Sequence, residues 1–175
     1  MAYRTKTYIA GDWDGDKSVI DKLYSWKNDN RLNLDFHDAH EMAQSRDTSL
    51  PCSIKASLKK RLDASKTFVL IVGNHTKNLT KGGCEFCTSY NGYGHYCARG
   101  YCASGESFVD YECRMALEAR MKIIVIYNST VVNRSLCPNQ LKSVGTHIPF
   151  YYDIGLTRYY NYNAVKTAVM NDDYW

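Results

Sequence analysis

Carboxylates gather at three places in this sequence of 175 residues. The first is Gly11–Asp16, with three aspartates, and the second is Asp38–Leu50, which also carries His40. The third is the string Asp110-Tyr111-Glu112. Carboxylates can bind polar groups of a ligand or act as acids and bases in catalysis. These segments are therefore candidate positions for ligand-binding or catalytic side chains.

Four of the seven cysteines form a second constellation of reactive side chains. Cys84 and Cys87 are three residues apart, Cys97 and Cys102 follow, and His95 lies between the pairs. Two short-spaced pairs separated by a turn are typical of a tetrahedral zinc site. The spacing predicts structural Zn²⁺ on the four thiolates, with His95 as an alternate ligand. A loop of free cysteines, or disulfides formed on purification, explains the same pattern.

The elements that must position these groups alternate between strand and helix. β-Branched and apolar runs predict strands, and apolar residues at three- and four-residue spacing predict helices. The expected strands are Thr5–Ala10, Leu32–Asp38, Thr67–Val72, Lys122–Tyr127 and His147–Tyr152. The expected helices are Asp16–Lys27, one that opens at Ser53, Ser107–Met121 and Tyr162–Met170.

Such alternation favours an α/β fold, a three-layer sandwich with helices on both faces of a parallel sheet. Right-handed crossovers make 2-1-3-4-5 the expected strand order, as in flavodoxin-like folds. Since ligands bind beyond the carboxyl ends of such strands, the three acidic segments are expected at one edge. Residues 1–175 are predicted to form a single domain. A Cys-, Gly- and Tyr-rich insertion at residues 82–107 interrupts the pattern.

Composition excludes several classes of protein. Twenty-two basic residues against 18 acidic ones leave a net charge of +4, too small a surplus to indicate a nucleic-acid partner. The longest apolar runs, Phe68–Val72 and Ile123–Tyr127, are too short to span a membrane. The first six residues lack the apolar stretch of a secretion signal. An odd number of cysteines then favours the reducing cytoplasm.

Several strings together resemble a known family. They are Tyr8–Asp12, Phe36–His40, Ser65–Thr76, Val109–Glu112 and Lys122–Ile126. In this order they are similar to the TIR-like family of bacterial proteins, in the branch of the TIR component of the Thoeris anti-phage system. The resemblance covers roughly residues 5–127, apart from the insertion, and implies a TIR-like fold.

The resemblance also implies an activity. TIR enzymes cleave NAD⁺ at the bond between nicotinamide and ribose, and their essential glutamate matches Glu112. Nicotinamide leaves as a neutral molecule, so a fixed carboxylate beside an oxocarbenium-like ribose is sufficient and no cofactor is required. The loop that begins at Asp38 would close over the substrate. The implied substrate-binding residues are Ala10, Gly11, Asp12, Trp13, Asp38, His40 and Tyr111.

The same family implies partners. Attack by water gives ADP-ribose, and attack by an adenine nitrogen of the same molecule gives a cyclic product. The protein is expected to make an ADP-ribose-type signal in anti-phage defence, and this signal would activate a separate effector protein. Residues Asp38–Leu50 are expected to mediate self-association.

Two other functions are compatible with the residues. The string Tyr8–Gly11, and the glutamate at the start of a helix ahead of Lys122–Ile124, also resemble the nucleoside 2-deoxyribosyltransferases. Against this alternative, that family should have a proline where this chain has Asp12. A non-catalytic TIR interaction module would not require Glu112. The presence of Glu112 favours an enzyme.

Overall fold

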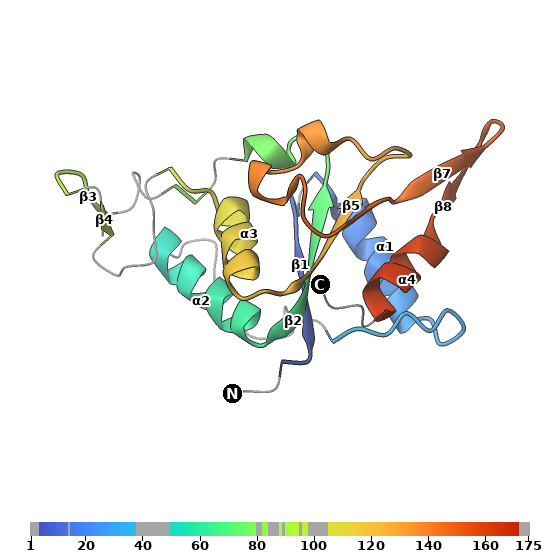
Figure 1. The fold of residues 1–175 in the computed structure, drawn as a ribbon, viewed down its shortest axis with the longest axis horizontal. Coiled ribbons are helices and arrows are strands. Elements are labelled where there is room, and N and C mark those ends of the chain that lie inside the picture. The colour runs from blue at the N-terminus through green and yellow to red at the C-terminus, as the bar shows by residue number, and fades with distance from the viewer. Residues whose placement is uncertain are drawn as a thin grey trace.

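A parallel sheet of four strands forms the centre of the molecule (Figure 1). The computed structural model describes residues 4–13, 15–37, 50–79, 82–83, 88, 90–94, 96–97 and 105–171. Within them the strands lie side by side in the order β1-β2-β5-β6, and every neighbouring pair is parallel. Their bounds are β1 (Lys6–Ala10), β2 (Ser65–Val72), β5 (Lys122–Tyr127) and β6 (Thr146–Pro149).

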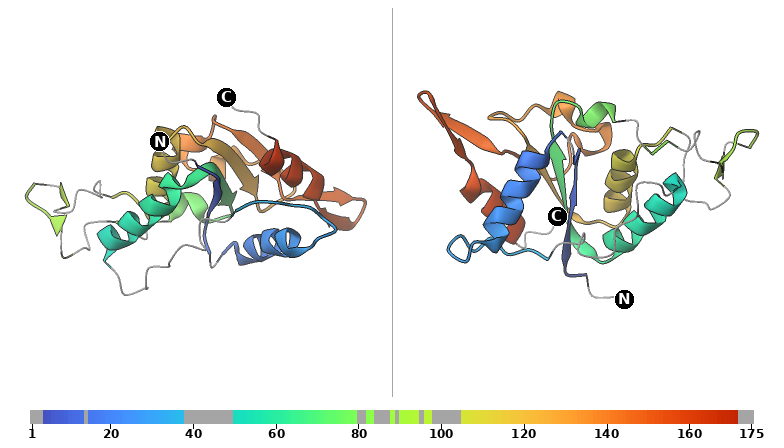
Figure 2. Two further views of the ribbon diagram at one scale, coloured as in Figure 1. Left: turned by 90° about the horizontal axis from the view of Figure 1, so that it is seen from below. Right: turned by 180° about the vertical axis from the view of Figure 1, so that it is seen from behind.

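Helices cover both faces of this sheet, as Figure 2 shows. On one face pack α2 (Pro51–Asp63) and α3 (Phe108–Glu118), and on the other pack α1 (Lys17–Asn28) and α4 (Tyr162–Met170). From Phe68 to Val72 strand β2 is apolar and buried on both of its faces, as expected for a strand between two helical layers. The predicted three-layer α/β fold is confirmed.

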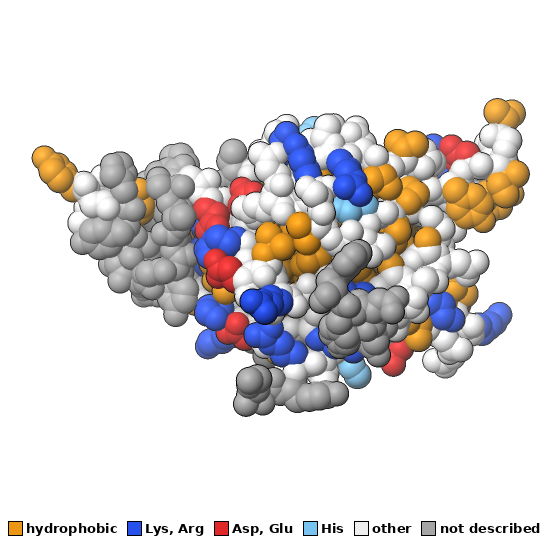
Figure 3. All heavy atoms as spheres, in the orientation of Figure 1, with side chains coloured by type: hydrophobic (Ala, Val, Ile, Leu, Met, Phe, Trp, Pro, Cys, Tyr) orange, Lys and Arg blue, Asp and Glu red, His pale blue; other side chains and the backbone are white. Residues whose placement is uncertain are grey.

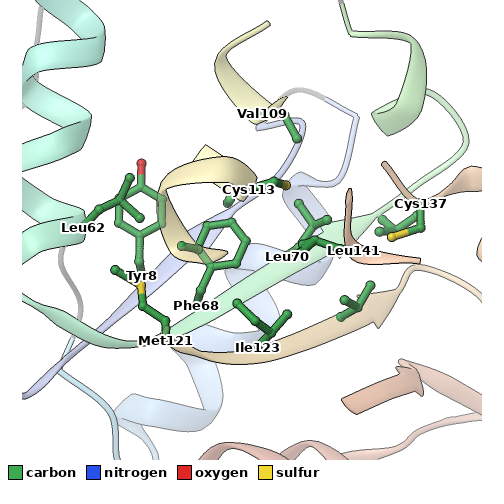
Figure 4. Packing of buried hydrophobic residues seen from close by; sticks show 14 of the residues in the cluster. Tyr8, Leu62, Phe68, Leu70, Val109, Cys113, Met121, Ile123, Cys137 and Leu141 are labelled. Atoms are coloured by element: carbon green, nitrogen blue, oxygen red, sulfur yellow. The ribbon is translucent and has the colours of Figure 1, made fainter. Parts of the chain in front are cut away.

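The core on the α2–α3 face holds Tyr8 of β1 in place (Figure 4). The ring of Tyr8 stacks on Phe68 of β2, with 5.8 Å between the ring centroids and 12° between their planes. Leu62 of α2 belongs to the same cluster. Tyr8 is therefore fully buried, and the direction of its hydroxyl is set by this packing.

The predicted strand Leu32–Asp38 differs from expectation in its hydrogen bonding. Up to His37 the segment does not pair with a neighbouring strand through a β-ladder, although Leu34 and Phe36 are buried. The backbone N–H of Thr7 in β1 donates to the carbonyl of His37 at 2.5 Å, so the segment ends beside β1. It occupies the edge position of the expected 2-1-3-4-5 order. Only its alternate apolar residues are buried, so side-chain packing rather than strand pairing holds it there.

The end of the chain also differs from the prediction. The strand expected at His147–Tyr152 ends at Pro149, and the residues after Phe150 form an antiparallel hairpin, β7 (Tyr151–Ile154) and β8 (Thr157–Tyr160). The hairpin projects away from the sheet in Figure 1. Its sequence signal is two runs of aromatic and β-branched residues separated by the two-residue turn Gly155-Leu156.

The remaining elements are short. Strands β3 (Tyr90–Asn91) and β4 (Tyr96–Cys97) pair within the insertion, and 3₁₀ turns occur at η2 (Thr76–Asn78), η4 (Arg134–Leu136) and η5 (Asn139–Leu141). Among the described residues, none of the helices has the length and apolar character needed to cross a membrane.

Candidate active site

Glu112 lies in the second turn of α3, close to the helix start. Ser107 caps this helix: its hydroxyl oxygen accepts from the backbone N–H of Asp110 at 3.1 Å and its hydroxyl donates to the Asp110 carboxylate at 2.7 Å. A helix that runs antiparallel to the strands starts near their carboxyl ends. The expected helix start at Ser107 is confirmed, and it places Glu112 near that edge of the sheet.

The Glu112 carboxylate is directed into the layer between the helices and the sheet, and the residue is only 7% exposed. The buried hydroxyl of Tyr8 donates a hydrogen bond to Oε1 of Glu112. Within the described part of the chain, no hydrogen bond is found to Oε2. One carboxylate oxygen is thus oriented by the sheet.

Burial raises the pKa of Glu112 from 4.5 to about 7, because the surrounding apolar groups cannot solvate its charge. Two interactions oppose this effect: the hydrogen bond from Tyr8, and the positive charge of Arg61 on α2. The carboxyl group is therefore poised near neutral pH. Glutamates with a pKa in this range are frequent among catalytic acids and bases.

The chain that leaves β1 forms a second part of the same edge. Gly11 passes so close to β2 that a Cβ at this position would lie 3.2 Å from Cβ of Ile71. The carbonyl of Asp12 then accepts from the backbone N–H of Asp16 at 2.7 Å, which turns the chain into α1. Trp13 remains 43% exposed and Ala10 is buried in the strand. The structure thus brings Ala10, Gly11, Asp12 and Trp13 to the carboxyl end of β1.

A polar cluster that the sequence did not reveal ties three strand ends together. Asp16, which is buried, accepts from the side-chain amide of Asn128 at 2.8 Å and from the hydroxyl of Thr76 at 3.5 Å. The backbone N–H of Gly73 donates to that hydroxyl at 2.8 Å. Desolvation raises the pKa of Asp16, and the hydrogen bond from Asn128 counteracts it. Each of these residues follows the end of β1, β2 or β5 in the sequence. That position at a strand end is the one sequence feature that could have predicted the cluster.

Tyr111 lies in a different environment from Glu112. It is buried, with the ammonium group of Lys55 5.4 Å and the guanidinium carbon of Arg114 5.3 Å from its ring centroid. Lys55 of α2 also donates to the carbonyl of Glu106 at 2.8 Å, and Arg114 pairs with the Glu106 carboxylate at 2.8 Å. These contacts fix the chain directly ahead of the helix that carries Glu112.

Several predicted site residues lie outside the described residues: Asp38, His40, Cys84, Cys87, His95 and Cys102. Only the backbone of Cys97 is described, in β4, where it pairs with Tyr90. The chain therefore reverses direction between the two cysteine pairs. Among the side chains that the structure does describe, no group of three histidines, cysteines or acids could hold a metal ion.

Comparison with known proteins identifies the family. Residues 8–94 match the family described as Thoeris protein ThsB, TIR-like domain. The match begins at Tyr8, covers α1, α2 and β2, and ends within the insertion, ahead of α3. None of the curated proteins matches the chain. The parallel α/β sandwich is the fold expected of a TIR-like domain, in agreement with this match. The chain belongs to the TIR-like family of Thoeris ThsB proteins.

Proposed function

We propose that this protein cleaves NAD⁺ at the nicotinamide–ribose bond and that Glu112 is its catalytic carboxylate. The observation that carries the proposal is the state of Glu112, a nearly buried carboxyl oriented by Tyr8 and poised at a pKa of about 7 near the carboxyl edge of the sheet. Membership of a Thoeris TIR-like family is consistent with this chemistry.

The proposed reaction needs no general acid. The bond between ribose C1′ and the nicotinamide nitrogen breaks, and its electron pair leaves with nicotinamide, which becomes neutral. Ionised Glu112 stabilises the positive charge that develops on the ribose ring. Water then adds to C1′ and gives up a proton, for which a carboxylate of pKa near 7 is a suitable acceptor. An adenine nitrogen in place of water gives a cyclic product.

The substrate site is proposed to extend from Glu112 to the end of β1. Ala10, Gly11 and Asp12 would form one wall there, and the exposed indole of Trp13 offers a face for ring stacking. Asp38 and His40 would complete the site from the loop that follows. The described contacts of Tyr111 are with Lys55 and Arg114, so its role toward the substrate stays a prediction.

Incubation of the purified protein with NAD⁺, followed by chromatography, tests the proposal. We expect release of nicotinamide in equal amount to ADP-ribose or a cyclic isomer. NAD⁺ that stays intact, both alone and with extract of phage-infected cells, would contradict it and favour a non-catalytic interaction module. Base exchange on a deoxynucleoside without cleavage of NAD⁺ would favour a deoxyribosyltransferase.

The product is proposed to act as a signal in anti-phage defence. We propose that an ADP-ribose-type molecule made by this chain activates a separate effector protein. Adding the purified reaction product to the effector, without this protein, tests that part of the proposal.

Tyr8→Phe should shift the pH dependence of the reaction toward higher pH. The change keeps the ring that stacks on Phe68 but removes the hydrogen bond that favours ionised Glu112. A hydrogen bond to a charged group contributes about 1.5 kcal/mol, so the lower limb of kcat/KM against pH should move upward by about one pH unit.

Tyr127→Phe is the matched control, because it removes a buried hydroxyl that contacts His147 rather than Glu112. Its pH profile should follow that of the wild type. A Tyr8→Phe profile with an unchanged limb would show that this hydroxyl does not set the ionisation of Glu112.

The zinc site in the insertion stays a prediction. Strands β3 and β4 reverse the chain between Cys87 and Cys97, and two ligand pairs separated by a turn can supply a tetrahedral site. Protein purified without added zinc should contain about one equivalent of Zn²⁺ by elemental analysis, and replacing Cys84 and Cys87 by serine should remove it. Less than about a tenth of an equivalent in the wild type would contradict the prediction.

A further inference from the structure

Lys55 of α2 is a basic residue in the interior of the protein, with 0% of its surface exposed. Other ion pairs of this region are at the surface: Lys59 pairs with Asp63, and Figure 3 shows acidic and basic side chains side by side over α2 and α3. Burial lowers the pKa of Lys55, because its charge loses water. A lysine is almost never fully buried unless it is paired, so its ammonium group must be held by contacts within the protein.

The ammonium group of Lys55 holds the chain at the start of α3. It donates to the carbonyl oxygen of Glu106 at 2.8 Å and lies 3.7 Å from Oε2 of the Glu106 carboxylate. Arg114, in the second turn of α3, donates to the same carboxylate from Nε at 2.8 Å and from Nη2 at 3.3 Å. Glu106 directly precedes Ser107, the cap of α3. One residue thus connects α2 with the first two turns of α3.

The ring of Tyr111 belongs to the same group of side chains. Its centroid lies 5.4 Å from the Lys55 ammonium group and 5.3 Å from the Arg114 guanidinium carbon. Both distances are within the range of about 6 Å over which an aromatic ring attracts a cation. We call Lys55, Glu106, Tyr111 and Arg114 the cationic clamp. Tyr111 directly precedes Glu112, so the clamp acts on the part of α3 that carries the proposed catalytic carboxyl.

The direction of the Glu112 carboxyl depends on the rotation of α3 about its axis. A side-chain end lies about 6 Å from the axis of its helix, so a rotation of about 10° moves it by about 1 Å. A displacement of this size would break the hydrogen bond between Glu112 and the hydroxyl of Tyr8. Apolar packing also holds α3 on the sheet, but it is non-directional. Hydrogen bonds and ion pairs specify the rotation more sharply.

We propose that Lys55 is a positioning residue for Glu112: through Glu106 and the ring of Tyr111 it fixes the rotation of α3 at which the carboxyl meets Tyr8. The proposal rests on the catalytic role proposed for Glu112. The groups that act on the charge of Glu112 are Tyr8 of β1 and Arg61 of α2. Lys55 therefore acts on the orientation of the carboxyl rather than on its charge.

Lys55→Met removes the ammonium group and keeps an unbranched apolar stem. Glu106 keeps its ion pair with Arg114, so no charge is left buried without a partner. The kcat of NAD⁺ cleavage should fall about 10–100-fold with KM within about twofold of the wild type, since misplacing a catalytic group by about 1 Å has an effect of this size. An unchanged kcat overturns the proposal.

Lys59→Met is the matched control. It is the same substitution one turn further along α2, at an exposed ion pair with Asp63. Its kcat should stay within about twofold of the wild type, because exposed ion pairs contribute little. Thermal unfolding shows whether both variants fold. Lys55→Gln, which removes the charge but keeps a hydrogen-bond donor, replaces Lys55→Met under the same criteria if the latter does not fold.

NMR titration of the Glu112 carboxyl, with isotope-labelled glutamate, tests the orientation without NAD⁺. In the wild-type background Tyr8→Phe should raise the pKa of Glu112 by about one unit, because it removes a hydrogen bond to the ionised form. In the Lys55→Met background the carboxyl no longer meets Tyr8, so the same change should shift the pKa by less than about 0.3 unit. The Lys59→Met background should show the full shift.

Equal shifts in the three backgrounds overturn the proposal, whatever the activity of the protein. NAD⁺ left intact by the wild type overturns the proposed function instead, and the titration still decides whether Lys55 orients Glu112.

Discussion

Glu112→Gln should reduce the rate of NAD⁺ cleavage by about a thousandfold or more, with little change in KM. The amide is nearly isosteric and can still accept the hydrogen bond from Tyr8, so the packing between α3 and the sheet is kept. What is lost is the negative charge beside the ribose. Removing one preoriented group that stabilises transition-state charge costs about 10²–10³-fold, and a full charge in a nearly dry site contributes more.

Glu118→Gln is the control for this prediction. Glu118 lies on the same helix and loses the same charge, but its side chain is exposed and pairs with Arg114. Its activity should remain within about twofold of the wild type, since exposed ion pairs contribute little. Equal activity of the Glu112→Gln variant and the wild type would exclude Glu112 as the catalytic carboxylate.

The free energy of unfolding should fall by about 3 kcal/mol between pH 4.5 and 8 through Glu112 alone. The folded state holds this proton more tightly than the unfolded chain, because burial raises the pKa from 4.5 to about 7. Below pH 4.5 the group is protonated in both states and has no effect. Between the two pKa values only the unfolded state ionises, so stability declines as pH rises and then levels off above 7.

Glu112→Gln should therefore be more stable than the wild type at pH 8 and about equally stable at pH 4.5. Urea unfolding of both proteins across this range gives the difference. Burial lowers the pKa of His147, which makes stability rise with pH in part of the same window, but this contribution is common to both proteins. A difference that does not grow with pH would contradict the buried, ionising Glu112. A loss of stability at a residue of this kind is expected if it is kept for the proposed catalytic role.

The strands of the central sheet and the helices beside it could be predicted from local features of the sequence. The β-branched and apolar run Thr67–Val72 predicted a central parallel strand, and the structure has β2 there. Ser107 followed by an amphipathic stretch marked the start of α3, and with it the place of Glu112 near the carboxyl edge. Periodicity and capping act over a few residues, which is why sequence alone reveals them.

The contacts that define the site were beyond such reasoning. Tyr8 meets Glu112 across 104 residues of chain, and Asp16 meets Asn128 across 112. In the sequence, Tyr8 is one more aromatic residue of a strand. Its pairing with a carboxylate depends on the packing of α3 against β1, which no local pattern encodes. The raised pKa of Glu112 depends on the same packing, because the helices and the sheet around the carboxyl group exclude water from it.

The hairpin lies between these two cases. Its turn, Gly155-Leu156 between aromatic and β-branched runs, is a local signal that indicates the two strands. Its direction away from the sheet follows from the packing of Tyr160 and Phe150 on Trp26 of α1. The sequence by itself determined the central strands β1, β2 and β5, the four helices and the residue types at their ends, because those depend on neighbours along the chain. Only the tertiary structure decided which side chains meet, lose their water or remain exposed, because those properties depend on neighbours in space.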